Sequence, residues 1–552
     1  MTDNERLAEL LFGDITETPD DILQKFPARD LKEGAAVTRF APSPTGFLHI
    51  GGLFAAMIAK RVAEMSDGIF YLRIEDTDKK REIENGVALI TDGLKAFGII
   101  PDEGFVDGEN SVGNYGPYRQ SERERIYKVF AKKLVLEGRA YPCFCDEDRL
   151  SNLRDEQKEA KLRTGYYGKY ALCRDLSYDD IEAKVKSGMP YVVRLRSLGS
   201  EENKIKFNDL IKGTIEMPQN DQDIVILKQD GIPTYHFAHA VDDTLMRTTH
   251  VVRGDEWISS VPVHIELFTS LGFKVPKYAH IAPIMKEEDG GKRKLSKRKD
   301  PEAAVSFYSE EGYPAESVND YLMTLANSDF EQWRRLNMRE DIGKFKFKLK
   351  GMSVSGALFD MTKLIDVSKD RISVMTADQV LNLVLEWSKE NDAELYNLLS
   401  ADKALAREIL NIERDKKKPR KDIAKWSDVR DYLAYFYNDL WDGVRELPEN
   451  ISKADAAAVL KAYISAYSAD DDKDTWFAKI KSVCDPLGFA SEVKEYKNNP
   501  DSYKGHVGDV STIIRIAVTG RACTPDLYDI MRLLGAEAVK RMSDFATELE
   551  GK

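Results

Sequence analysis

Cysteine and long apolar runs are scarce in this sequence of 552 residues. Its five cysteines are too few for a disulfide-stapled scaffold and favour a reducing compartment. No apolar run reaches the roughly 20 residues that a transmembrane helix needs, so no membrane partner is expected. Residues 1–6 are polar and partly acidic, which argues against a secretory signal peptide. Together with the lack of internal repeats, these absences predict a globular, cytoplasmic protein.

A surplus of acidic residues gives the chain a formal net charge of −13, from 94 Asp and Glu against 81 Lys and Arg. By itself this charge argues against a polyanionic partner. Binding of nucleic acid, however, depends on local basic surface, and the Lys and Arg residues are clustered along the chain. A nucleic-acid partner therefore stays open. The length indicates roughly three to five domains.

A strand, a turn, a helix and a second strand follow one another near the start of the chain. Residues 35–41 form a short apolar run, and the prolines and glycine of residues 42–46 force a turn. From Leu48 on, apolar side chains recur at helical spacing. A second apolar run at residues 68–74 ends in the acidic cluster of residues 75–78. This order predicts a parallel sheet, and such sheets bind ligands at the carboxyl ends of their strands.

The remainder of the chain changes character several times. Residues 119–222 are rich in Tyr, Lys and Arg and hold three of the five cysteines, so we interpret them as an inserted domain. Apolar runs at residues 223–227 and 250–253 then predict that the sheet resumes. Beyond about residue 285 the sequence is basic, and beyond about residue 373 it is largely helical.

The turn after the first strand has the features of a phosphate-binding loop. The run Ala-Pro-Ser-Pro-Thr-Gly-x-x-His-Ile-Gly-Gly begins at Ala41 and leads into the predicted helix. The free N–H groups and partial positive charge of a helix N-terminus attract phosphate, and Thr45 and His49 can donate to it. A Pro/Gly turn with an incidental histidine is the alternative. Because the whole run follows a strand, the phosphate site is favoured.

A second loop, KLSKR at residues 294–298, is the other candidate for phosphate chemistry. Mobile ammonium groups such as those of Lys294 and Lys297 stabilise the negative charge that accumulates on departing pyrophosphate. Two glycines just before the loop supply a hinge. An isolated run of charge is more often a solvated loop. Leu-Ser between two lysines, downstream of the resumed sheet, favours the functional interpretation.

With both motifs, the sequence resembles the bacterial-type glutamyl-tRNA synthetases, which are class I aminoacyl-tRNA synthetases, over nearly everything after about residue 35. The run Arg-Phe-Ala-Pro-Ser-Pro-Thr-Gly from Arg39 is specific to that family within the class, whereas glutaminyl enzymes carry a Pro-Glu-Pro-Asn-Gly variant. Gly52 stands in place of the second histidine of the general His-Ile-Gly-His motif. A small residue is common there in the glutamyl family, so this departure supports the resemblance.

The resemblance implies an α/β Rossmann-like catalytic domain of the class I synthetases. It also implies that an inserted α/β acceptor-binding domain splits this catalytic domain, and that an all-α anticodon-binding domain ends the chain. The expected boundaries are an N-terminal extension of unknown role at 1–35, catalytic halves at 36–118 and 223–285, the insertion at 119–222, a stem-contact region with the KLSKR loop at 286–372, and the anticodon-binding domain at 373–552.

The implied reaction has two steps. ATP and L-glutamate form glutamyl-adenylate and pyrophosphate, with Mg²⁺ accompanying ATP, and the glutamyl group then passes to the 3′ end of tRNA(Glu) with release of AMP. The resemblance also implies that tRNA must be present before activation proceeds. Two alternatives stay open: a non-discriminating enzyme that also charges tRNA(Gln), and a catalytically inactive tRNA-binding paralogue. A glutamyl-queuosine tRNA synthetase is disfavoured, because that group lacks an anticodon-binding domain. A monomer is expected.

Glutamate carries two carboxylates and one ammonium, so a selective site needs cations for the former and an acceptor for the latter. We assign the substrate carboxylates to Arg39 and Arg253, with Tyr235 helping at the side chain, and the ammonium to Glu75. Paired Arg contacts reject glutamine, whose amide brings no charge. The alternative for Arg253 is an ion pair with Asp255 or Glu256, and the role of His239 is open. The full glutamate site that the resemblance implies is Arg39, Ala41, Ser43, Glu75, Tyr235 and Arg253.

The resemblance also implies the residues that handle ATP. The catalytic groups are His49, Lys294 and Lys297, which would act by positioning and charge stabilisation without a covalent enzyme intermediate. The ATP-binding set is Thr45, His49, Gly51, Gly52, Glu256, Ser296 and Lys297.

Cys143, Cys145 and Cys173 form the one plausible metal cluster of the sequence. Some family members bind zinc here through Cys-x-Cys followed by Cys-x-His. Zinc takes about four N, S or O ligands, and in this chain Asp175 stands where the histidine would be. Tyr170 or Asp175 could substitute. The alternative is three reduced, buried cysteines without metal.

Three further segments bear on RNA binding. The basic run of residues 413–421 falls in the implied anticodon-binding part, and an exposed linker is an equal alternative. Residues 343–348 alternate Lys and Phe, which favours an amphipathic strand with Phe inside and Lys in water over a phosphate contact. The glycine in residues 518–521 favours a structural role, either a helix cap or close packing.

Overall fold

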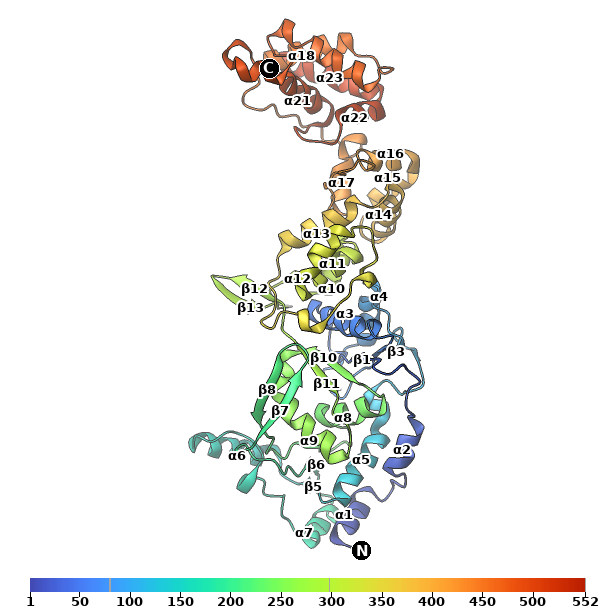
Figure 1. Cartoon of the computed structure of the whole chain (residues 1–552), viewed down its shortest axis with the longest axis vertical. Coiled ribbons are helices and arrows are strands. Elements are labelled where there is room, and N and C mark those ends of the chain that lie inside the picture. The colour runs from blue at the N-terminus through green and yellow to red at the C-terminus, as the bar shows by residue number, and fades with distance from the viewer. Residues whose placement is uncertain (79–80, 297, 552) are drawn as a thin grey trace. The chain divides into compact units, whose positions relative to one another are not determined.

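The computed structural model describes residues 1–78, 81–296 and 298–551, and the chain folds as two compact units (Figure 1). Unit 1 comprises Met1–Ser309 and Val318–Met361, and unit 2 comprises Glu310–Ser317 and Thr362–Lys552. Within the described ranges, every helix is too short or too polar to cross a lipid bilayer.

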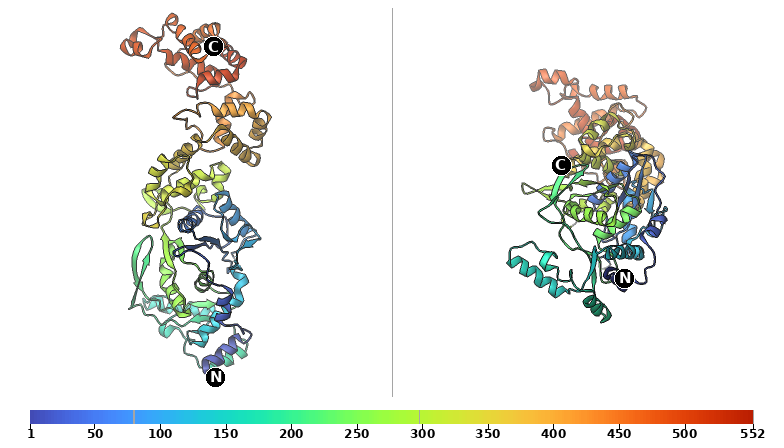
Figure 2. Two further views of the ribbon diagram at one scale, coloured as in Figure 1. Left: turned by 45° about the vertical axis from the view of Figure 1, so that its right-hand side comes forward. Right: turned by 60° about the horizontal axis from the view of Figure 1, so that its bottom comes forward.

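The N-terminal extension is helical. Each of its two helices begins with a capping box, Thr2 with Glu5 and Thr18 with Asp21, in which the side chains satisfy the first free N–H groups. The first helix packs against α5 and α7 of the insertion (Figure 2). The extension therefore packs as part of unit 1. Its helices are α1 (Asp3–Phe12) and α2 (Pro19–Lys25), and their neighbours are α5 (Glu124–Leu136) and α7 (Tyr178–Lys186).

The predicted strand–turn–helix–strand unit is present. The first two strands pair in parallel, with Val37 opposite Ile69, and the third continues the parallel pairing. Phe70, Tyr71 and Leu72 are fully buried, which explains the uninterrupted apolar run of this strand. The elements are β1 (Val37–Phe40), α3 (Ile50–Glu64), β2 (Ile69–Leu72), α4 (Gly86–Ala96), β3 (Glu103–Phe105) and β4 (Ser111–Val112).

A second parallel pair lies on the other side of β1. The Thr249 N–H donates to the Val37 carbonyl over 2.9 Å, which places the start of β10 beside β1. The chain thus leaves β1 on one side toward β2 and returns on the other side at β10. This arrangement is a topological switch point, where open α/β sheets bind ligands. The elements are α8 (Tyr235–Leu245), β10 (His250–Gly254), α9 (Val261–Leu271) and β11 (Lys277–Ile281).

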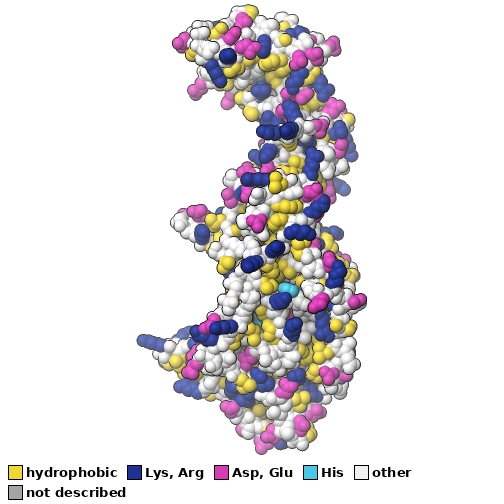
Figure 3. All heavy atoms as spheres, in the orientation of Figure 1, with side chains coloured by type: hydrophobic (Ala, Val, Ile, Leu, Met, Phe, Trp, Pro, Cys, Tyr) yellow, Lys and Arg dark blue, Asp and Glu magenta, His cyan; other side chains and the backbone are white. Residues whose placement is uncertain are grey.

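The insertion has a sheet of its own, and this corrects one prediction. The strand at residues 223–227 forms, but it pairs antiparallel with β6, Val193 opposite Leu227, and does not resume the catalytic sheet. A three-residue apolar strand has no feature that specifies its partner. On the face drawn in Figure 3, Lys and Arg side chains gather over the projecting end of the insertion near α6. Its other elements are β5 (Ala140–Cys143), α6 (Glu147–Glu159), β6 (Val192–Leu195), β7 (Lys204–Asp209), β8 (Gly213–Pro218) and β9 (Val225–Leu227).

A β-hairpin precedes the KLSKR loop. Asp289 and Gly290 have φ values of 50° and 77°, the signature of a type I′ turn, which Asp-Gly favours. In residues 343–348 the phenylalanines are buried and the lysines exposed, as predicted, but the segment is not a paired strand. The elements here are β12 (Met285–Glu288), β13 (Gly291–Lys294), α10 (Val305–Glu311), α11 (Ala315–Ala326) and α12 (Ser328–Leu336).

Unit 2 is helical, as predicted, and its core includes Val380, Val459 and Ile513. Gly520, with φ 71°, caps α21, in agreement with the prediction for residues 518–521. The basic run 413–421 lies in a turn between α16 and α17. The helices are α13 (Met361–Ser373), α14 (Ala377–Asn391), α15 (Ala393–Ala401), α16 (Lys403–Asn411), α17 (Asp428–Leu433), α18 (Lys453–Ala466), α19 (Lys473–Ser482), α20 (Val493–Asn498), α21 (Val507–Thr519), α22 (Leu527–Leu534) and α23 (Ala536–Glu550).

Candidate active site at the switch point between β1 and β10

A cavity of about 750 Å³ lies at the carboxyl ends of β1, β2 and β10. All six residues predicted to bind glutamate line it. Thr45 and Ser296 do not line it, and Lys297 lies outside the described residues. The cavity therefore joins the predicted amino-acid site to most of the predicted ATP site. The predicted residues in its wall are Arg39, Ala41, Ser43, His49, Gly51, Gly52, Glu75, Tyr235, Arg253, Glu256 and Lys294.

The first motif presents a helix N-terminus to the cavity. His49 is the N-cap of α3, and its Nδ1 accepts a hydrogen bond from the Gly51 N–H over 3.0 Å. An accepting Nδ1 leaves the proton of a neutral imidazole on Nε2. His49 can therefore donate from Nε2 at the N-terminus of α3, where the partial positive charge of the helix favours phosphate oxygens.

A buried ionic network forms one wall of the cavity. Asp243 Oδ2 accepts from Arg39 over 3.2 Å, and its Oδ1 accepts from Arg73 over 2.6 Å. Arg73 also donates to Glu75 over 2.9 Å. Burial opposes every charge here, but the two guanidinium groups outweigh it at Asp243 and hold the pKa of that carboxyl well below its usual range. Burial raises the pKa of Glu75 despite Arg73 and Arg39.

Arg253 is held differently, by uncharged partners. Its three nitrogens donate to Tyr235 Oη over 3.3 Å, to His280 Nε2 over 3.1 Å and to His264 Nδ1 over 3.2 Å. Burial, with the neighbouring charges of His239 and Arg253, lowers the pKa of His264 well below the usual histidine value. The guanidinium is thus buried with neutral direct partners.

The alternative predicted for Arg253 is wrong. Asp255 pairs with Lys212 over 3.0 Å, and Glu256 lies 4.0 Å from Lys294. In the part of the chain that the structure describes, neither carboxylate forms an ion pair with Arg253. Glu256 and Lys294 are far apart in the sequence and were both predicted to handle ATP, and the fold brings them close together.

The KLSKR loop is tied down at its base by Asp300. Arg293 donates to both oxygens of this buried carboxylate over 2.6 and 2.8 Å, and the Ser296 N–H donates over 2.9 Å. Lys286, from the hairpin strand β12, lies 3.1 Å from the same carboxylate. These hydrogen bonds, led by Arg293, lower the pKa of Asp300. The hydrogen bonds to Asp300 therefore connect the β12–β13 hairpin to the base of the KLSKR loop, beside the cavity.

Comparison with known proteins identifies the family of the chain. Residues 35–366 match the family described as tRNA synthetases class I (E and Q), catalytic domain. The chain is 51% identical over 541 residues to the glutamate–tRNA ligase of Clostridium perfringens strain 13, covering 97% of this chain and 99% of that protein. The chain belongs to the class I glutamate–tRNA ligases.

Further comparisons extend over both units. Residues 380–545 match an anticodon binding domain. The glutamate–tRNA ligase of Clostridium beijerinckii is 47% identical over 545 residues, 98% of this chain and 99% of that protein. A crystal structure of a glutamate tRNA ligase from Elizabethkingia meningosepticum in complex with its amino acid matches with a TM-score of 0.74 at 25% identity, covering 93% of this chain and 100% of that chain.

Several residues in or beside this cavity were not predicted from the sequence. Arg73 could have been predicted from the sequence, because a charged residue within an apolar strand usually has a buried partner of opposite charge. Nothing in the sequence indicated that Asp243 or Trp257 belongs to the site. Helix periodicity can place Asp243 on a face of its helix, but it does not identify the residues that this face contacts. The Trp257 ring lies 4.3 Å from that of Tyr235 and closes the aromatic side of the cavity.

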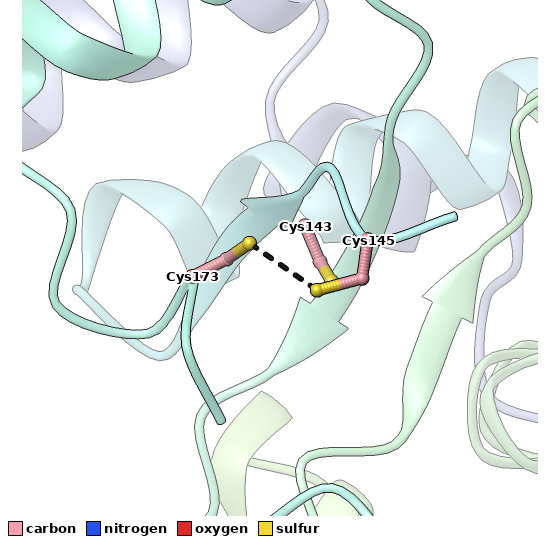
Figure 4. Close-up of side chains that lie close together, drawn as sticks. All are labelled: Cys143, Cys145 and Cys173. Carbon is pink, nitrogen blue, oxygen red and sulfur yellow. Dashed lines mark hydrogen bonds between the residues drawn. The ribbon is translucent and has the colours of Figure 1, made fainter. Parts of the chain in front are cut away.

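The three predicted metal ligands do come together (Figure 4). The Sγ atoms of Cys143, Cys145 and Cys173 all lie within 4.8 Å of one another. The hydroxyl of Tyr166, which the sequence did not single out, lies 3.3 and 3.4 Å from the Sγ atoms of Cys143 and Cys145. Asp175, one of the two predicted substitutes, instead pairs with Arg196 over 3.0 Å.

Proposed function

We propose that the cavity activates L-glutamate with ATP and that the chain then transfers the glutamyl group to the 3′ end of tRNA(Glu). The main support is the contrast between two guanidinium groups in one cavity. Arg39 is compensated by Asp243, whereas the direct partners of Arg253 are neutral. An uncompensated cation of this kind favours a carboxylate over an amide.

In this proposal glutamate binds with its side-chain carboxylate at Arg253 and Tyr235. Its α-carboxylate lies toward Arg39, and its ammonium meets Glu75. An α-carboxylate oxygen attacks the α-phosphorus of ATP, the bond to the β-phosphate breaks, and pyrophosphate leaves with the electron pair. A ribose hydroxyl of the tRNA 3′ end then attacks the adenylate carbonyl and releases AMP. No enzyme residue becomes covalently bound.

Charge stabilisation on the leaving pyrophosphate comes from His49, the N-terminus of α3 and Lys294, with Lys297 predicted from the sequence alone. Mg²⁺, when bound with ATP, supplies further neutralisation of the phosphate oxygens. Glu256 is the exposed carboxylate of the cavity wall and is suited to a hard cation or to the ribose of ATP.

ATP–pyrophosphate exchange tests this function. Exchange that depends on glutamate, requires tRNA(Glu) and is not supported by glutamine is the expected result. Absence of exchange both with and without tRNA would overturn the proposal and favour an inactive tRNA-binding paralogue. Charging of purified tRNA(Glu) and tRNA(Gln) in parallel decides whether the enzyme also serves tRNA(Gln).

The cysteine cluster is proposed to hold zinc. Three thiolates and the Tyr166 hydroxyl supply the four donors that a structural site takes. Purified protein should contain about one zinc ion per chain. Cys173→Ser should lose the metal and unfold at lower temperature, whereas Cys484→Ser, a buried cysteine elsewhere, should keep it. Zinc-free wild-type protein of full activity would contradict the site.

A further inference from the structure

Two histidines accept hydrogen bonds from Arg253, and this fixes their tautomers. A guanidinium only donates, so the ring nitrogens that face it, His280 Nε2 and His264 Nδ1, must both be unprotonated acceptors. The ring proton of neutral His280 therefore sits on Nδ1, which donates to Asp209 Oδ2 over 2.7 Å. In the same way His264 carries its proton on Nε2, which donates to His236 Nδ1 over 2.9 Å.

The Asp209 carboxylate is held in place as a hydrogen-bond acceptor by backbone N–H groups. It is 2% exposed at the end of β7, and its Oδ1 accepts from the N–H groups of Ile211 and Lys212 over 3.0 and 2.9 Å. Its Oδ2 accepts from the backbone N–H of His280 over 3.1 Å as well as from the ring. Burial opposes its charge, but the bonds from His280 and the two N–H groups lower its pKa below the usual aspartate value.

The imidazole of His280 separates Asp209 from Arg253. At Arg39, by contrast, Asp243 is in direct contact and compensates most of the guanidinium charge. A neutral imidazole orients the guanidinium through a hydrogen bond and leaves its charge available. The donor–acceptor order runs Arg253, His280, Asp209, and reversing the His280 tautomer would set two N–H groups against each other.

We propose that Asp209 is a positioning residue for the glutamate-binding arginine: through the tautomer of His280 it holds Arg253 in place, so that the β7–β8 hairpin of the insertion helps to set affinity for glutamate. This inference rests on the proposed role of Arg253. It gives Asp209 an effect on the amino-acid site although the residue does not line the cavity.

Asp209→Asn in the full-length chain is the direct test. An amide cannot accept on both of its sides, so it loses acceptors either at Ile211 and Lys212 or at His280. When the amide N–H₂ faces His280, it forces the proton onto Nε2 and against Arg253. Aspartate-to-asparagine changes behind a functional histidine act in this way. We expect the KM for glutamate in exchange to rise about tenfold or more while the KM for ATP stays within about twofold.

A rescue experiment separates this role from a merely structural one. His280→Gln supplies a carbonyl acceptor that needs no tautomer, so Asp209→Asn should change the KM for glutamate by less than about twofold in that background. His280→Leu, without an acceptor, should raise this KM in the presence of Asp209. Glu216→Gln, which removes an exposed carboxylate from β8 of the same hairpin, is the matched control and should change neither KM.

The outcomes distinguish the two levels of the proposal. Unchanged glutamate KM in Arg253→Lys would mean that the proposed function of Arg253 fails. A raised KM in Arg253→Lys with an unchanged KM in Asp209→Asn would overturn only the positioning role. Parallel rises in the KM values for glutamate and ATP, or equal effects of Asp209→Asn with His280 and with Gln at that position, would also overturn it. If Asp209→Asn does not fold, equal glutamate KM values for His280→Gln and His280→Leu contradict the role.

Discussion

Buried arginines at the site differ in what compensates them. Arg73 is fully buried and meets Asp243 and Glu75 directly, so it serves the network that shapes the cavity. Arg253 is almost as buried but contacts Tyr235 and histidines. A buried charge without an opposite charge beside it is costly. A substrate carboxylate therefore stabilises the Arg253 guanidinium more than a water molecule in the same place would. Amino-acid selectivity is thereby concentrated at this residue.

Tyr235→Phe isolates one hydrogen bond of that residue. The ring keeps its packing on Trp257, while Arg253 loses the hydroxyl acceptor. The donor is a charged guanidinium, and hydrogen bonds to charged groups contribute about 1.5 to 3 kcal/mol. The KM for glutamate should therefore rise about tenfold or more, with little change in the melting temperature. Steady-state exchange and thermal unfolding measure the two quantities. A KM equal to that of the wild type would remove Tyr235 from the glutamate site.

His236 makes stability depend on pH. Burial, with the charge of Arg253, lowers the pKa of His236 to about 4. The folded state thus favours the neutral ring, and this stabilisation is complete above the unfolded pKa of about 6.5 and is lost as the pH falls toward 4. About 2 kcal/mol should be lost by about pH 5. Thermal unfolding at pH 7 and pH 5 should show a smaller drop for His236→Gln than for the wild type, and equal drops would contradict the assignment.

Residues carried by contiguous motifs were predictable, and their partners were not. Arg39, Glu75 and Arg253 lie at strand ends that a parallel sheet brings to one edge, so sequence order placed them in one cavity. Asp209 and His280 belong to different strands, and no spacing in the sequence records that β7 runs beside β11. Their contact is a tertiary contact, which depends on how the insertion packs against β11.

At the scale of elements, the hairpin β12–β13 and its loop are fixed by one carboxylate. Asp300→Ala would leave Arg293 without its main partner and free the base of the KLSKR loop. We expect the exchange rate to fall about tenfold or more, with the KM for glutamate within about twofold of the wild type. Glu287→Ala, at an exposed position of the same hairpin, is the control. Equal exchange rates in the two variants would show that the hydrogen bonds to Asp300 play no part in glutamate activation.

Element prediction succeeded where periodicity was long and failed where it was short. The apolar stripe after Leu48 gave a 15-residue helix, and the largely helical region after residue 373 is helical in unit 2. The run at residues 223–227 was recognised as a strand but assigned to the wrong sheet, because three apolar residues fit any sheet. Residues 343–348 kept the predicted alternation without a pairing partner.

For the whole molecule, the net charge of −13 hides a local basic surface. Each phosphate neutralised by Lys or Arg releases counterions, so tRNA binding should weaken steeply with salt. Raising potassium chloride from about 50 to about 200 mM should raise the KM for tRNA at least tenfold, whereas the KM for glutamate, set inside the cavity, should change by less than about twofold. Equal salt sensitivity of the two KM values would contradict this separation.

The chain belongs to the class I glutamate–tRNA ligases, so we expect it to charge tRNA(Glu) with glutamate. Charging of purified tRNA(Glu) with radiolabelled glutamate and ATP by the full-length protein tests it most directly. We expect acid-precipitable glutamyl-tRNA that requires ATP, is not formed with glutamine in place of glutamate, and is strongly reduced in Arg253→Ala. Full-length, folded protein that forms no glutamyl-tRNA, or that charges glutamine equally well, would contradict it.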